Sequence, residues 1–423
     1  MKCAPLISRE TETVIRGARF AINPLAPSYV SIGFTGGRIT QVTTSQFRSC
    51  RTNSNSTTID LSGFLVLPGF VNAHDHLEFA LFSRLGDPPY RNYVEWGEDI
   101  HRKFADVIAE VRAVPKNIRA WWGGLRNLLC GVTTVCHHNA LLPDLQRRDF
   151  PVRVLQDYGW GHSLALGGDL TASCRATPQG RAFIVHASEG VDDLAREELW
   201  TLDRLGILGE DTVLVHGLAI GPDGAERIRQ RGASMIVCPS SNAFLFGRLP
   251  DLWMLAVVGN LALGNDSPLT AEGDLLDEIR FTIRACRIAP VTVYRMVTTI
   301  PAGILKLENG EGTICESGVA DLVAVLDHND TIDERLRELS AKDIELVIIH
   351  GRVQLASKTI FERLPLSLRR GMEPLCVDGV IRWLRVPVRD LLHATEDVLG
   401  AGKVSLSGRQ IRLLDQTEIE DAE

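Results

Sequence analysis

Short apolar runs that end in polar residues recur through the middle of the chain, and amphipathic stretches separate them. Apolar runs of this length read as strands buried on both faces of a parallel sheet. Strands that alternate with helical stretches are typical of repeated βα units. The runs predicted as strands are 64–72, 131–136, 152–156, 182–185, 212–215, 234–237 and 261–264, and the main helices are expected over 118–129, 192–205, 225–231 and 274–288.

Both ends of the chain have a different, β-rich pattern. Residues 13–22 and 29–42 read as β-rich runs, the second with a hairpin turn at Gly36-Gly37, and residues 320–325 and 345–349 can rejoin them. We therefore predict an α/β fold: a (β/α)8-type TIM barrel, which takes about 250 residues, plus a small β-sandwich built from both chain ends. The expected division is 1–66 for the N-terminal part of the sandwich, 67–317 for the barrel, and 318–423 for the return to the sandwich and a C-terminal extension.

One barrel strand is hard to place. Residues 157–181, between the third predicted strand and the strand that ends before His186, are short and rich in glycine. The segment has little room for a helix, a strand and a second helix with their loops. The fourth strand is therefore predicted to be shortened, irregular or missing.

Composition excludes several classes of function. A net charge of -8 over 423 residues gives no basic surface for nucleic acid or for an anionic membrane. The nine cysteines contain no CxxC pair, which favours reduced thiols in a cytoplasmic protein. The longest apolar run, residues 252–263, is too short to span a bilayer. A small-molecule partner is expected, and assembly into a homo-oligomer stays open.

The candidate chemistry lies where the predicted strands end. His74 and His76 stand one residue apart at the end of the first strand, so both side chains point to one side and can chelate an ion. His186, His216 and Asp266 follow three later strands. Residues at the carboxyl ends of barrel strands meet at one mouth. We expect these side chains to converge there.

The motifs around these residues resemble the amidohydrolase superfamily, in particular its cytosine deaminase, triazine hydrolase and guanine deaminase branch. Six short motifs in the same order carry the resemblance, and any one of them alone would be weak evidence. They are PGFVNAHDH (68–76), GVTT (131–134), HASE (186–189), LVHG (214–217), CPSSN (238–242) and LGNDS (263–267).

The resemblance implies a metal site and its chemistry. His74, His76, His186 and Asp266 would hold one divalent metal, for which zinc suits the donors and iron(II) would also fit. In this pattern His216 polarises the substrate or the attacking water, Asp266 also accepts a proton, and Glu189 carries a proton to a substrate nitrogen.

The number of metals follows from a missing residue. Two-metal members of the superfamily usually bridge their ions by a carbamylated lysine on the fourth strand. Between Lys116 and Lys306 this sequence contains no lysine. The sequence therefore predicts a site for a single metal.

The resemblance implies hydrolysis of a non-peptide carbon–nitrogen bond, with deamination of an aminated nitrogen heterocycle as the first reading. A hydrolase of cyclic amides or imidazolones, a triazine-type chlorohydrolase and a catalytically silent barrel scaffold are the alternatives. Substrate contacts are harder to assign, because each candidate side chain also has a structural explanation as a loop anchor, ring support or turn residue. The candidates are Arg84, Trp96, His138 and Asn242.

Overall fold

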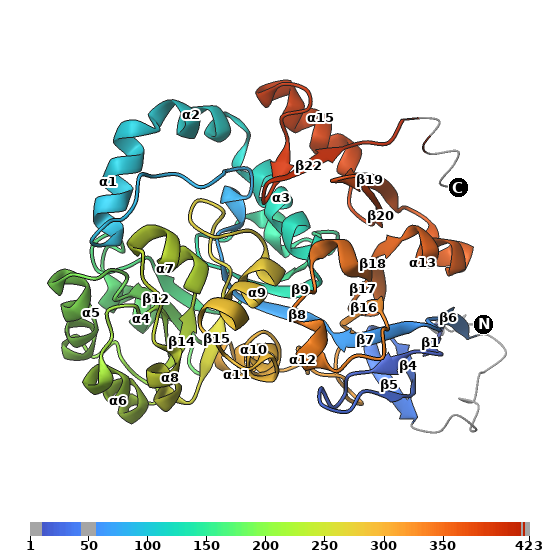
Figure 1. The fold of residues 1–423 in the computed structure, drawn as a ribbon, viewed down its shortest axis with the longest axis horizontal. Coiled ribbons are helices and arrows are strands. Elements are labelled where there is room, and N and C mark those ends of the chain that lie inside the picture. Colours follow the sequence, from blue (N-terminus) through green and yellow to red (C-terminus); the bar gives the residue numbers. More distant parts are fainter. Residues whose placement is uncertain (1–10, 44–55, 416–417, 419–423) are drawn as a thin grey trace, which may run out of the picture.

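The computed structural model describes residues 11–43, 56–415 and 418. A central set of parallel strands with helices around it lies beside a β-structure in which the blue N-terminal and orange C-terminal segments run together (Figure 1). Within the described residues, no helix is long and apolar enough to cross a membrane.

Eight parallel strands form the centre of the molecule, in two arcs. Ladder hydrogen bonds order them β10-β9-β8 and β11-β12-β13-β14-β15. The amide of Asp266, just after β15, donates to the carbonyl of His74 in β8 at 3.0 Å and joins the ends of the two arcs. The strands are β8 (Phe70–Asp75), β9 (Val132–His137), β10 (Arg153–Val154), β11 (Gly159–Gly161), β12 (Phe183–Ala187), β13 (Thr212–His216), β14 (Ser234–Val237) and β15 (Leu261–Leu263).

The four helices predicted in this part of the chain are present. Those four are α3 (Lys116–Leu129), α5 (Asp193–Arg204), α6 (Pro222–Arg231) and α9 (Leu275–Ala285). Further helices of this part are α4 (Leu170–Ala176), α7 (Pro239–Phe246), α8 (Leu252–Leu255), α10 (Pro290–Met296) and α11 (Thr299–Ile304).

The fourth strand exists in shortened form. It is β11, only three residues long, and it pairs in parallel with β12 but not with β10. A Cβ on Gly159 would overlap Thr177, and a Cβ on Gly161 would overlap Leu170 at the start of α4. The two glycines therefore let α4 pack directly against the strand, which is why the segment needs so few residues.

The prediction that both chain ends share one β-structure is confirmed. β16 (Leu322–Leu326) pairs with β7 (Phe64–Pro68), within a ten-stranded sheet that a four-stranded sheet of N-terminal residues faces. Ile15, Ile32 and Ile59 of the small sheet pack with Phe64 and Ile348 of the large one in a shared apolar core. The domain boundaries at 66/67 and 317/318 stay predictions.

The large sheet runs in the order β21 (Ser405–Leu406), β22 (Arg409–Arg412), β19 (Glu373–Val377), β20 (Val380–Leu384), β18 (Arg352–Ser357), β17 (Ile344–Ile349), β16, β7, β2 (Arg19–Phe20) and β3 (Ser28–Tyr29). The small sheet contains β5 (Arg38–Thr43), β4 (Ser31–Thr35), β1 (Thr13–Arg16) and β6 (Thr57–Asp60). Three short helices connect C-terminal strands of the large sheet: α12 (Ile332–Arg335), α13 (Lys358–Arg363) and α14 (Leu366–Arg369).

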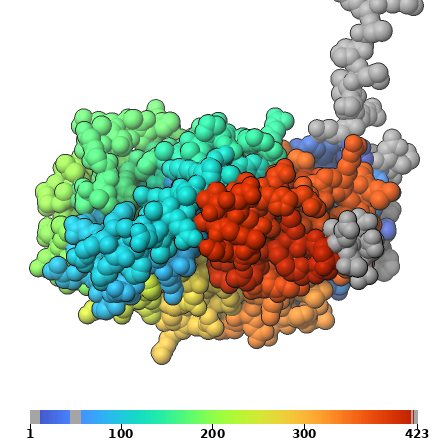
Figure 2. Space-filling view, turned by 90° about the horizontal axis from the view of Figure 1, so that it is seen from above, coloured from blue at the N-terminus to red at the C-terminus, as the bar shows by residue number. Residues whose placement is uncertain are grey.

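The C-terminal extension braces the central part of the molecule. Its helix α15 (Val388–Leu399) packs on α3, where the indole of Trp122 donates to the hydroxyl of Thr395 at 2.7 Å. In the space-filling view the red extension lies against the cyan segment near residue 100 (Figure 2). That segment contains α1 (Tyr93–Lys103) and α2 (Ala105–Ala113). No helix or strand was predicted from the sequence for this stretch.

A close approach between α3 and the turn after β8 gives a test of this packing. A Cβ on Gly123 would overlap the backbone of Leu77, whereas a Cβ on Gly303 in α11 meets nothing within 4 Å. Gly123→Ala should therefore lower the free energy of unfolding by about 1–3 kcal/mol, as overpacked cores do. Gly303→Ala, also in a helix, should raise the thermal midpoint. Equal midpoints for both variants in a thermal melt would contradict this packing.

Candidate active site

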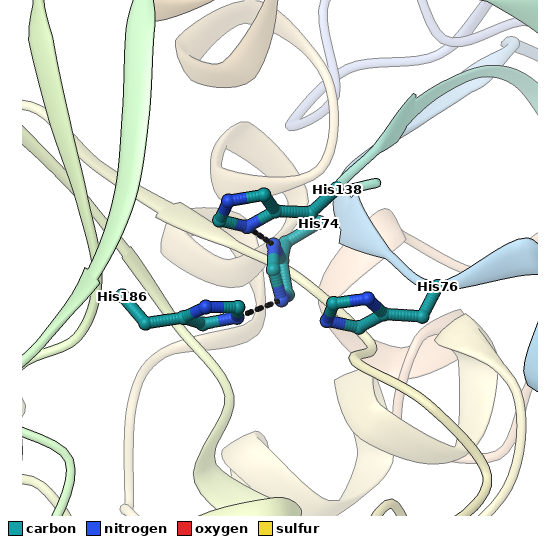
Figure 3. Close-up of side chains that lie close together, drawn as sticks. All are labelled: His74, His76, His138 and His186. Carbon is teal, nitrogen blue, oxygen red and sulfur yellow. Dashed lines mark hydrogen bonds between the residues drawn. The ribbon is translucent and has the colours of Figure 1, made fainter. Parts of the chain in front are cut away.

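The residues expected at the mouth of the barrel lie together at the carboxyl ends of the strands. His74 and His76 come from β8 and its end, His186 from β12, His216 from β13, and Asp266 follows β15. All five side chains are buried. Figure 3 shows the imidazoles of His74, His76 and His186 turned toward one another.

Four donor atoms have the spacing that one metal ion requires. Nε2 of His74 lies 3.2 Å from Nε2 of His186 and 3.7 Å from Oδ1 of Asp266, and Nε2 of His76 lies 3.7 Å from the same oxygen. Tetrahedral zinc with bonds of roughly 2.0–2.2 Å separates its donors by about 3.3–3.6 Å. Three imidazoles and one carboxylate at these separations fit a single divalent cation.

A fourth imidazole, that of His138, belongs to the same cluster. Ligand atoms of His74, His76, His138 and His186 all lie within 4.8 Å of one another. His138, however, contacts Nδ1 of His74, on the edge of the ring opposite the Nε2 that faces His186 and Asp266 (Figure 3). Nδ1 of His138 therefore faces Nδ1 of His74 and not the Nε2 atom of His74 that faces His186 and Asp266.

Asp75, which lies between His74 and His76 in the sequence, forms a buried ion pair with Arg126. One guanidinium nitrogen of Arg126 donates to both oxygens of Asp75 at 2.7 Å and to the backbone carbonyl of Asp266 at 3.1 Å. Asn72 and Asn127 donate to the same carboxylate. Asp75 thus points away from the metal donors, and its network ties β8 to the loop that carries Asp266.

Three hydrogen-bond donors besides the histidines hold the carboxylate of Asp266. Its Oδ2 accepts from the hydroxyls of Ser241 at 2.8 Å and Thr270 at 3.1 Å, and the amide of Ser267 donates to Oδ1 at 2.7 Å. Burial opposes a charge here, but the contacts with His74 and His216 outweigh it and hold the pKa of Asp266 well below its usual range. Asp266 is therefore ionised.

Glu189 has the opposite electrostatic state. Burial raises the pKa of its carboxyl well above the usual value, and the charges of Asp266 and Glu198 raise it further. Glu189 is therefore protonated at neutral pH. Its Oε2 lies 3.5 Å from Nε2 of His216.

His216 is oriented by a side chain behind it. The Oδ1 atom of Asn242 accepts a hydrogen bond from Nδ1 of His216 at 3.1 Å, which leaves Nε2 facing Glu189 and Asp266. Burial lowers the pKa of His216 to about 4, so the ring is neutral at pH 7. Both His216 and Asp266 adopt positive φ angles, 76° and 59°, an uncommon backbone conformation that clusters at functional sites.

Two further histidines of the site, His76 and His186, are also neutral at pH 7. Burial, followed by the neighbouring imidazoles, lowers the pKa of His76 and of His186 well below the usual value. Their ring nitrogens are therefore available as lone-pair donors at pH 7. The side-chain amide nitrogen of Asn139 lies 3.1 Å from Nδ1 of His76 and donates to Oε1 of Glu78 at 2.9 Å.

The site opens into a cavity of about 190 Å³ whose wall is largely apolar. Glu189, His216 and Asp266 stand at its inner end, and helices α1 and α2 form much of its outer wall. Such a pocket suits a flat, weakly polar molecule with a few polar anchors. Its apolar wall includes Phe79, Phe82, Trp96, Ile100, Ile108 and Leu269.

The candidate substrate contacts separate into two groups. Trp96 lines the cavity, with its indole N–H donating to the carbonyl of Leu85 at 2.9 Å. Arg84, His138 and Asn242 are not among the lining residues. The guanidinium of Arg84 donates to the carbonyls of Thr270 and Ala271 and stacks over Phe244, so Arg84 anchors a loop.

Sequence reasoning missed most of the outer wall. Ile100, His101, Ile108 and Arg112 line the cavity from α1 and α2, and His162 lines it from the end of β11. A signal for α1 was present in the sequence. Asn92 accepts hydrogen bonds from the amides of Val94 and Glu95 and caps the helix.

Fold and donor set together define an α/β protein with a metal-binding site at the carboxyl ends of its strands. The family model for the amidohydrolase family matches residues 176–354. A curated 5-methylthioadenosine/S-adenosylhomocysteine deaminase of Thermococcus sibiricus is 23% identical over 372 residues, covering 71% of this chain and 85% of that protein. The family model and this relative support the resemblance to the amidohydrolase superfamily that the motifs indicated.

Solved structures show the same fold over most of the chain. A triazine hydrolase variant aligns with a TM-score of 0.73 and 16% identity, covering 92% of this chain and 100% of that one. An adenosine deaminase from Xanthomonas campestris with bound zinc aligns with a TM-score of 0.64 and 20% identity, covering 82% and 93%. At these identities the likeness describes the fold.

The ion pair behind the histidines should be important for stability. Arg126 is 2% exposed, and removing one partner of such a pair leaves an uncompensated charge in the interior. Arg126→Ala should therefore lower the free energy of unfolding by about 3–5 kcal/mol in denaturant titrations. Arg229→Ala breaks an exposed pair with Glu226 on α6 and should leave the midpoint unchanged. Similar losses in the two variants would contradict a special role for Arg126.

The protonated state of Glu189 predicts a pH-dependent stability. Unfolding lets this carboxyl ionise above its ordinary pKa near 4.5, so its burial costs more stability as the pH rises. In metal-free protein, Glu189→Gln should melt at a higher temperature than the wild type at pH 8, and the gap should close toward pH 5. Glu197→Gln changes an exposed carboxylate on α5 and should follow the wild type. A gap that does not vary with pH would argue for an ionised Glu189.

Proposed function

We propose that this protein is a metal-dependent hydrolase that deaminates an aminated nitrogen heterocycle. The observation that carries the proposal is a protonated Glu189 and an ionised Asp266 at the inner end of one apolar cavity. Two carboxyl groups held in opposite protonation states form an acid–base pair. Deamination needs such a pair, because the attacking water must lose a proton and the heterocycle that releases its amino group must gain one.

The proposed metal site consists of His74, His76, His186 and Asp266. When bound there, one divalent metal, zinc by preference, would supply a Lewis acid that lowers the pKa of water to about 7. The absence of lysine between Lys116 and Lys306 and the glycine-rich β11 support a single-metal site. We also propose that the two arcs of parallel strands close as the expected eight-stranded barrel.

The protein groups account for the proton movements. Asp266 accepts a proton from the attacking water at Oδ2, the oxygen 4.0 Å from Nε2 of His216. Glu189 donates its proton to the ring nitrogen beside the carbon that is attacked. Nδ1 of His216 donates its proton to Asn242, so Nε2 of the neutral ring is an acceptor. Through this acceptor His216 orients the water or the exocyclic nitrogen. The bond between carbon and the amino group then breaks, and ammonia leaves with the proton that Asp266 took from water. The remaining hydroxyl proton returns to Glu189, which restores both carboxyl groups.

The apolar cavity favours a flat heterocycle with few charged groups. The relatives include a deaminase named for 5-methylthioadenosine and S-adenosylhomocysteine. Aminated purines are therefore the first class of substrate to test on this chain. Pyrimidines, pterins and triazines extend the panel. Release of chloride from a chlorotriazine, or ring opening without ammonia, would identify the two alternative hydrolase activities.

The proposal predicts both metal content and product. Purified protein should contain about one equivalent of zinc or iron, as metal analysis will show, and should release ammonia from at least one aminated heterocycle. Removing the metal with a chelator should abolish ammonia release, and adding zinc should restore it. A protein without metal would support the scaffold alternative.

A matched pair of variants tests the proton donor. Glu189→Gln keeps the size and neutrality of the side chain but cannot give up a proton, so it should retain the metal and lose most turnover, roughly 10²–10⁴-fold. Glu272→Gln changes an exposed carboxylate and should retain both metal and turnover. Unchanged turnover in Glu189→Gln would remove Glu189 from the mechanism.

A further inference from the structure

Two successive carbonyl groups at the end of β11 point toward histidines of the cluster. The carbonyl of Gly161 accepts from Nε2 of His138 at 3.0 Å. The carbonyl of His162 accepts from Nδ1 of His186 at 2.7 Å and from the backbone amide of His186 at 3.0 Å. Successive carbonyls of an extended strand point to opposite sides within the sheet. β11 can therefore reach one histidine on each of the two arcs.

The bond to His162 determines the tautomer of His186. A carbonyl oxygen only accepts hydrogen bonds, so Nδ1 of His186 must carry the proton. In the neutral ring Nε2 then holds a lone pair. This nitrogen faces Nε2 of His74 at 3.2 Å, on the side of the proposed metal.

The same argument gives the tautomer of His138 and, from it, the tautomer of His74. The carbonyl of Gly161 requires a proton on Nε2 of His138, so Nδ1 of the neutral His138 ring is an acceptor. Nδ1 of His74 lies 3.2 Å from that acceptor and must donate to it. The proton of His74 is thereby held on Nδ1, and its Nε2 is left as a lone pair toward His186 and Asp266.

We infer that the short fourth strand prepares two of the proposed metal ligands through its backbone, directly for His186 and through His138 for His74. His138 is then a positioning residue, and it neither binds the metal nor touches substrate. The inference rests on the metal site of the proposed function. It gives the fourth strand a role that needs no side chain from that strand.

Local packing holds these carbonyls in place. Gly161 lies so close to Leu170 of α4 that a Cβ would overlap that side chain. His138 is 0% exposed, and its ring stacks on that of His186 with centroids 4.2 Å apart. The hydrogen-bonded path from Gly161 through His138 to His74 is therefore excluded from water and rigidly packed. Hydrogen bonds to the far side of a ligating histidine orient its ring and raise its basicity.

A competing assignment makes His138 a fourth imidazole ligand, since its ring belongs to the same cluster. The two assignments differ in what must replace the ring. A ligand needs a strong metal donor, whereas the positioning role needs only an acceptor at the place of Nδ1. The side-chain oxygen of asparagine can take that place, and leucine offers no acceptor at all.

Zinc affinity, measured by competition with a chromogenic chelator and without substrate, separates the assignments. His138→Asn should bind zinc within about threefold of the wild type, and His138→Leu should lose roughly 10–100-fold, as is typical when a partner behind a metal ligand is removed. Equal losses in both variants would overturn the inference in favour of ligation by His138. A wild type that binds no zinc would instead overturn the metal site of the proposed function.

Nitrogen NMR of the zinc-loaded wild type provides a readout that does not depend on variant folding. Long-range ¹⁵N–¹H spectra should show His74 and His186 protonated at Nδ1, and His138 neutral with its proton at Nε2 and no zinc-bound nitrogen. Leu170→Ala, which loosens the packing on Gly161, should weaken zinc binding less than His138→Leu. A His138 nitrogen with the shift of a zinc ligand would overturn the inference.

Discussion

The buried pair between Asp75 and Arg126 is the interaction on which the site depends most. Asp75 lies between His74 and His76, and its contact with Arg126 turns its charge away from the space that the histidines enclose. The same guanidinium bonds the backbone of Asp266. A single interior cation from α3 thus aligns the first strand with the loop after the last one. The donors from both ends of the parallel strand set meet because this pair holds them.

Burial alone does not decide the charge of the groups in the cavity. Glu189 and Asp266 are both 6% exposed, yet one is protonated and the other ionised. The difference lies in their partners. Contacts with the neighbouring imidazoles lower the pKa of Asp266, whereas the charges that act on Glu189 are those of other carboxylates. The acid–base pair therefore arises from imidazoles and carboxylates that are distributed unequally within one buried pocket.

The C-terminal extension contributes to the site indirectly. α15 packs against α3, the helix that carries Arg126, and Lys403 forms an ion pair with Glu110 of α2 at 3.5 Å. α2 in turn supplies Ile108 and Arg112 to the outer wall of the cavity. The extension that the sequence left without a function thus supports both the inner network and the outer wall.

Local patterns in the sequence were sufficient for the strand ends and their chemistry. A period-two pair such as His74 and His76, or a histidine directly after an apolar run as in His186 and His216, depends only on the strand that carries it. The convergence of these residues followed from the parallel arrangement. The shortness of β11 was also foreseeable, because residues 157–181 contain too little chain for a full unit.

Contacts between distant segments were decided by the tertiary structure alone. His138 and Asn242 were expected at the substrate, but they bond to His74 and His216, 64 and 26 residues away. Arg84 was expected there as well, yet its partners are backbone carbonyls near residue 270. Hydrogen-bond partners and pKa shifts depend on which groups share a buried space, and no local pattern encodes that. The sequence by itself determined which residues can do chemistry, and only the packing of the strands decided which of them face the cavity.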